Sequence, residues 1–153
     1  MQAPHAVIGH PGSDHLGVQV LSRTHPGATD YWDGNWVRCR VSVRAHPFEG
    51  TFIGDLRTDE LERLHEDLTA LYQDLRGELH FENMDGHLTF NITGDGRGHF
   101  SLEGIVQSDP SAGQRLSFRL LFDQTDIPPI VADLATVLQS FPVRGEAPEG
   151  GSR

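Results

Sequence analysis

The spacing of apolar residues changes along this chain, and that change most limits the folds available to it. Apolar and polar residues alternate over 16–20 and again over 37–43, which is typical of half-buried β-strands. A third strand is expected over 48–56. Over 58–76 the apolar period becomes three and four residues, which predicts an amphipathic helix. Its apolar stripe consists of Leu61, Leu64, Leu68, Leu71 and Leu75.

Alternation returns after this helix and predicts a meander of four antiparallel strands. A turn at residues 85–86 would set Phe81 opposite Phe90 and would place polar residues opposite each other on the second face. A longer loop of odd length that includes Arg97 is expected next, because it would restore an apolar pair of Phe90 and Leu102. The four strands would then share one apolar face.

The last predicted strand pairing sets Gly104 opposite Phe118, so that a ring covers the space left by the glycine. A final helix follows, opened by Pro128-Pro129 and ended by Pro142. The expected order is βββ-α-ββββ-α. We therefore predict an α+β fold, a mainly antiparallel sheet of about seven strands with two helices packed on it.

The length of 153 residues fits one domain with a sizeable core. Residues 1–15 are rich in Pro, Gly and His without periodicity, and we expect a flexible N-terminal segment there. Residues 145–153 carry nothing to bury and are expected to form a disordered tail. The single α+β domain would span 16–144.

Composition limits the partners and the location of the protein. The chain has 22 acidic and 12 basic residues, a formal charge of −10, which disfavours nucleic acid and anionic membranes and favours a basic partner. Cys39 is the only cysteine, so no internal disulfide can form. The sequence carries no visible export signal and no apolar run of membrane-spanning length. We expect a cytoplasmic protein.

The titratable residues offer few candidates for chemistry. None of the nine histidines belongs to a metal-binding spacing pattern, so we predict no metal and no cofactor. His80 and Glu82 would share the polar face of one strand, and an enzyme built on them would need a pocket between the two side chains. Without a recognisable nucleophile or phosphate-binding motif, we predict that the protein is not an enzyme.

The heptapeptide DYWDGNW, residues 30–36, concentrates both tryptophans of the chain around one glycine. Asp33-Gly34 is typical of a two-residue hairpin turn, which would set Trp32 opposite Asn35 and pair two aromatic residues. The alternative is a small-ligand or carbohydrate-binding module in which Tyr31, Trp32 and Asp33 contact a sugar. Spacing does not choose between these two interpretations.

The predicted helix over 58–76 lies in the most acidic part of the chain. Residues 55–78 contain eight acids and three arginines. Such a surface is either a solvated face or a docking face for a basic protein.

Three segments of the chain resemble the WapI family of bacterial immunity proteins and its uncharacterised relatives. They are DYWDGNWVRCRVSV, the acidic leucine helix TDELERLHEDLTALYQDL, and LATVLQSFPVRG near the C-terminus. The resemblance covers about residues 16–144, and the W-D-G-N-W element is its most specific part. It implies a small cytosolic protein that neutralises the toxic domain of a cognate polymorphic toxin, often a nuclease, without catalysis of its own.

We therefore expect a protein that binds a basic toxin domain, binds neither nucleic acid nor membranes, and is a monomer or a weak homodimer. The residues expected to bind the partner are Asp59, Glu62, Glu66, Asp67, Asp74, Tyr31, Trp32 and Asp33.

Overall fold

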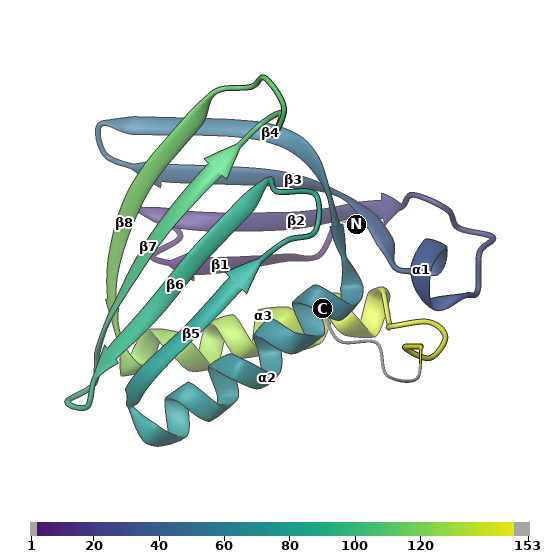
Figure 1. Ribbon diagram of the computed structural model, residues 1–153. Helices are drawn as coiled ribbons and strands as arrows, with labels where there is room; N and C mark the ends of the chain where they lie inside the picture. The colour runs from purple at the N-terminus through teal and green to yellow at the C-terminus, as the bar shows by residue number, and fades with distance from the viewer. Residues whose placement is uncertain (1–2, 149–153) are drawn as a thin grey trace.

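A computed structural model describes residues 3–148 and places them in two antiparallel sheets and three helices. The first sheet has the order β1-β2-β3-β4 and the second β5-β6-β7-β8. The strands of the two sheets cross, and two long helices run side by side beneath them (Figure 1). The predicted α+β class with mainly antiparallel pairing is confirmed.

The first sheet contains β1 (His5–Gly9), β2 (His15–Arg23), β3 (Trp36–Ala45) and β4 (Phe48–Arg57), with α1 (Tyr31–Gly34) between β2 and β3. The helix α2 (Thr58–Asp74) then leads to the second sheet. That sheet contains β5 (Arg76–Glu82), β6 (Leu88–Asp95), β7 (His99–Gln107) and β8 (Arg115–Asp123). A 3-10 turn, η1 (Gln124–Asp126), precedes α3 (Ile127–Ser140). Each half of the chain is thus four antiparallel strands followed by a long helix.

The strand β1 corrects the expected strand number from about seven to eight. It lies inside the segment 1–15 that was expected to be flexible, and it pairs with β2 from His5–Gln19 to Gly9–His15. Ala6 and Ile8 are buried in the core, which is what holds this short strand on the sheet. Of the expected disordered tail, residues 149–153 lie outside the described residues.

One hydrophobic core joins both sheets and both long helices. The alternating residues of β2 and β3 bury their apolar side chains, including Leu16, Val20 and Val41, which are fully buried. The leucine stripe of α2 and the apolar side of α3, with Ile130 and Leu134, cover the sheets. Cys39 is buried on β3, and its burial raises the pKa of the thiol to about 12. Among the described residues, no helix is long and apolar enough to cross a membrane.

The second sheet confirms two of the three predicted strand pairings. Phe81 faces Phe90, and the rings stack with centroids 4.9 Å apart. Gly104 faces Phe118 in β8, as expected.

The pairing of β6 with β7 is displaced from the prediction by two residues. Phe90 faces Gly104 and not Leu102. The loop occupies residues 96–98, where Gly96 and Gly98 both have positive φ, and the Asp95 carboxylate accepts hydrogen bonds from the backbone N–H groups of Arg97 and His99. Glycine adopts positive φ without steric cost, so the two glycines set the loop position. A displacement by two keeps every side chain on its predicted face.

Single residues fix the two ends of α2. Arg57 is the N-cap residue, and its N–H donates to the Glu60 carboxylate at 2.9 Å. The helix ends at Asp74, and Leu75 follows with a φ of 60°. The Leu75 N–H donates to Leu71, and its carbonyl accepts from Gly96, so this single residue joins helix and strand.

A test of the second sheet uses the glycine that faces Phe118. A Cβ added at Gly104 would lie 2.9 Å from Phe118 and 3.1 Å from Phe90, so we expect Gly104→Ala to lower the free energy of unfolding by about 1–3 kcal/mol. The matched control is Gly50→Ala, where nothing lies within 4 Å, and a change within about 0.5 kcal/mol is expected. Chemical denaturation measures both. Equal stabilities for the two variants would contradict this packing.

Candidate functional site

The heptapeptide at 30–36 forms a short helix, so the predicted hairpin at Asp33-Gly34 is wrong. Asp30 is the N-cap of α1, and its carboxylate accepts from the Asp33 N–H at 3.0 Å. Aspartate at an N-cap satisfies a backbone donor of the first turn. A Cβ on the buried Gly34 would lie 3.0 Å from the carbonyl oxygen of Ala28, which explains the glycine by close approach of the backbone.

The aromatic side chains of the heptapeptide surround the buried side chain of Arg57. The guanidinium carbon lies 5.2 Å from the ring centroid of Tyr31, 5.1 Å from that of Trp32 and 5.0 Å from that of Trp36. Cation–π contacts of this kind strengthen when the cation is removed from water, and the Arg57 side chain is 0% exposed. The rings therefore have a structural role, which composition alone did not reveal.

The donors of Arg57 are also satisfied. Its Nε donates to the Asp59 carboxylate at 2.9 Å, and its two terminal nitrogens donate to the carbonyl oxygens of Trp32 and Tyr31 at 2.6 and 2.7 Å. A guanidinium presents its donors in a fixed fork, so these bonds set the position of α1 on the start of α2. The hydroxyl of Tyr31 donates to the second Asp59 oxygen at 2.9 Å.

Asn35 completes the structure by binding the C-terminal segment. Its buried amide donates to the carbonyl oxygens of Tyr31 and Arg144 and accepts from the Thr58 hydroxyl and the Arg144 N–H, at 2.8–2.9 Å. These four bonds use the full capacity of an amide side chain. Two segments on which the family resemblance rests, residues 30–43 and 134–145, thus meet at one residue. We call Arg57, Asp59, Asn35 and the three rings around Arg57 the arginine clasp.

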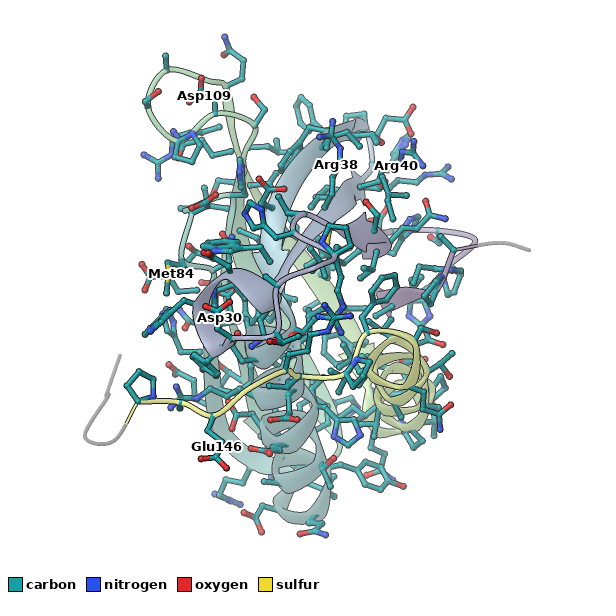
Figure 2. The ribbon with its side chains drawn as sticks, turned by 90° about the vertical axis from the view of Figure 1, so that its right-hand side faces the viewer. Asp30, Arg38, Arg40, Met84, Asp109 and Glu146 are labelled. Carbon is teal, nitrogen blue, oxygen red and sulfur yellow. The ribbon has the colours of Figure 1, made fainter. Side chains whose placement is uncertain are left out.

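A groove of about 1150 Å³ begins beside the clasp and runs between α2 and β5. Trp32 and Met84 line one end, and both side chains are nearly half exposed, at 47% and 49%. Figure 2 shows Met84 beside the helix that follows Asp30, with the segment carrying Glu146 crossing nearby. The groove has an acidic excess. Its charged and titratable lining residues are Glu60, Asp67, Asp74, Glu78, Glu82, Arg63, Arg76 and His80.

The structure brings together four of the eight residues expected to bind a partner. Asp67, Asp74, Tyr31 and Trp32 line the groove. Glu62, Glu66 and Asp33 are exposed but do not line it. Asp59 is buried and bonded to Arg57, so its carboxylate has a structural function.

Sequence reasoning missed the contribution of β5 and the following turn to this groove, including Glu78 and Met84. The acidic helix was visible in the sequence, but no pattern indicated that β5 would lie alongside it. The sugar-binding interpretation loses part of its basis here, because the ring and the hydroxyl of Tyr31 are both engaged within the clasp.

His80 and Glu82 lie in the groove lining at hydrogen-bond distance. The Nδ1 of His80 lies 2.6 Å from the Asn91 side-chain oxygen, and its Nε2 lies 3.3 Å from the Glu82 carboxylate. The contact with Asn91 and then that with Glu82 raise the pKa of His80 above its ordinary value. Both residues are exposed. Within residues 3–148, no group of three or more His, Cys, Asp or Glu side chains is placed to hold a metal ion.

Comparison with known proteins gives one informative result. The family model described as "Immunity protein WapI-like family" matches residues 7–142. No curated protein matches the chain significantly. A solved structure titled "Crystal structures of trypanosoma bruciei MRP1/MRP2" is 12% identical over 91% of this chain and 86% of that chain, with a TM-score of 0.47. A likeness this weak carries no conclusion about fold or function.

The clasp predicts a large effect of replacing its arginine. Arg57→Ala removes the charged donor to one oxygen of the buried Asp59 and one donor each from the carbonyl groups of Trp32 and Tyr31, so we expect the free energy of unfolding to fall by about 3–5 kcal/mol. Arg38→Ala, which changes an exposed arginine of β3, should alter stability by no more than about 0.5 kcal/mol. Denaturant unfolding of both variants measures the difference. A clasp variant as stable as the control would show that Arg57 does not hold these elements together.

The contacts of His80 predict a pH-dependent signal. Because the folded-state pKa is raised, protonation of His80 favours the folded state, and its contribution to stability is complete below the unfolded pKa and disappears as pH rises through the folded pKa. NMR titration of the ring should give a pKa above about 6.5, and Asn91→Ala and Glu82→Gln should each lower it. An unchanged pKa in both variants would contradict these contacts.

Proposed function

The chain belongs to the WapI-like family of immunity proteins, and from this we propose that it binds and neutralises the toxic domain of a cognate polymorphic toxin. Neutralisation would occur by binding alone, in the cytoplasm of the cell that must be protected. The family match over residues 7–142 is the observation that carries the proposal.

The charge of the protein supports a basic partner. A formal charge of −10 favours association with a cationic domain, such as one that binds nucleic acid. Electrostatic attraction between oppositely charged proteins speeds their encounter, which suits an inhibitor that must act before its toxin does. A nuclease-type toxin domain fits this chemistry.

Two surfaces of α2 are candidates for the contact. One is the groove side, with Asp67 and Asp74 along the helix and Trp32 at its N-terminal end, and the other is the exposed side with Glu62 and Glu66. We propose that the groove side makes the principal contact, because it combines carboxylates with the exposed apolar surface of Trp32 and Met84. Interfaces draw most of their affinity from such apolar anchors and their specificity from surrounding charges.

Co-expression with the toxin tests the proposal directly. The partner to use is the C-terminal domain of the toxin-like protein encoded beside this gene. We expect the chain to restore growth and to co-purify with that domain, with association slowing as salt is raised because charge attraction is screened. No rescue and no complex at low salt would overturn the proposed function.

Matched charge reversals on the two sides of α2 test the contact surface. Asp67→Lys with Asp74→Lys should weaken toxin binding by tenfold or more, whereas Glu62→Lys with Glu66→Lys should weaken it less, through the change in net charge alone. Both double variants change the formal charge by the same amount, and thermal unfolding checks that both remain folded. Equal losses, or a larger loss on the exposed side, would remove the groove as the principal contact.

A further inference from the structure

The strand β5 has a free edge that borders the groove. It is the outermost strand of its sheet and pairs only with β6. Figure 1 shows β5 at the side of the sheet nearest α2, and residues of both elements line the groove. An unpaired strand edge presents backbone donors and acceptors that can bind a further strand.

The register identifies the backbone groups that point into this space. The Asn83 N–H donates to the Leu88 carbonyl oxygen, so the backbone groups of Asn83 point toward β6. Because direction alternates along a strand, the backbone groups of Phe81 and Leu79 point toward β6 as well. Those of Glu78, His80 and Glu82 therefore point away from β6. The outward N–H of Met84 continues this series and donates to the Glu60 carboxylate at 2.6 Å, which closes one end of the edge.

The corresponding edge of the first sheet is covered. On β1, the outward N–H of Val7 donates to the carboxylate of Asp133 on α3 at 3.3 Å, and α3 packs against this strand. On β5 the middle of the edge faces an open groove. The two halves of the fold thus repeat the same topology, with a long helix packed near each edge strand. They differ because α3 supplies a carboxylate that accepts from the β1 edge, whereas a groove lies between α2 and β5.

The charges around the free edge indicate which kind of strand would bind there. The groove is lined by more acidic than basic side chains, so it favours cationic side chains of a partner. The acids are Asp67, Asp74, Glu78 and Glu82, and the bases are Arg63 and Arg76. The volume of the groove, about 1150 Å³, is larger than the roughly 300–1,000 Å³ of pockets that bind small molecules. The groove is also open to solvent, whereas such pockets are enclosed. An extended peptide segment would satisfy the backbone groups and the carboxylates together.

We propose that an extended, Lys- or Arg-containing segment of the toxin domain adds to β5 as a further strand, with an apolar side chain against Trp32 and Met84. This mode is β-strand addition, in which main-chain bonds supply affinity and alternate side chains supply specificity. The inference rests on the proposed function and specifies how the groove would be used.

Amide hydrogen exchange in the full-length protein tests it without a mutation. We expect the amides of Glu78, His80 and Glu82 to exchange rapidly in the free protein and to slow at least tenfold in the complex with the adjacent toxin domain. A complex that leaves these amides unprotected would overturn strand addition and leave the proposed function standing. Absence of any complex would overturn both. Protection that grows with the concentration of the free protein would identify a second copy of this chain as the occupant and overturn the inference.

A pair of substitutions at one position separates the backbone from the side chain. His80→Pro removes an outward N–H without removing a bond to β6, and His80→Thr keeps that N–H. We expect the proline variant to weaken toxin binding about tenfold relative to the threonine variant. Thr51→Pro, on the outward-facing edge of β4 in the other sheet, is the control and should bind normally. Equal binding by the two His80 variants would contradict the proposal.

Discussion

One buried cation, Arg57, organises the end of the fold where α1, the start of α2 and the C-terminal segment meet. Arg57 lies where β4 ends and α2 begins, and removing its charge from water is costly unless it is fully paired. The pairing comes from Asp59 on the same turn and from the backbone and rings of α1. This arrangement forces the short helix α1 to fold against the start of α2, and Asn35 then fixes the C-terminal segment at Arg144. The rim of the groove at Trp32 depends on these contacts.

Periodicity predicted the regular part of the fold because burial of one face dictates it. The leucine stripe of α2, the alternation in β2 and β3, and the pairing of Phe81 with Phe90 all follow from that constraint. The strand β1 escaped prediction because it has only five residues beside glycine and proline, too few for alternation to stand out. The loop at residues 96–98 shows a similar limit, since a pairing displaced by two residues buries the same faces, and only the φ angles of the glycines choose between the two registers.

The candidate site was predictable only in part, since local patterns describe single elements and the groove lies between two of them. Acidic residues of α2 were visible in the sequence, and Asp67 and Asp74 do face the groove. The motif at 30–36 has strong hairpin signals, Asp-Gly between aromatic residues, yet it forms a helix because Arg57, distant in sequence, needs its carbonyl groups as acceptors. A tertiary contact overrode a local preference. For the same reason Asp59, acidic and helical, lies inside the clasp and not on the surface.

The single-residue junction between α2 and β5 has a consequence for the kinetics of binding. Leu75 is held at a φ of 60° by bonds to Leu71 on one side and Gly96 on the other. Leu75 therefore joins the two walls of the groove at that end, and the hydrogen bond from the Met84 N–H to the Glu60 carboxylate joins them at the other. A preorganised site loses little conformational entropy when a partner binds to it. Association with the proposed partner would then be limited by diffusion, orientation and charge attraction and not by rearrangement, and substitutions of uncharged groove residues should act mainly on the lifetime of the complex.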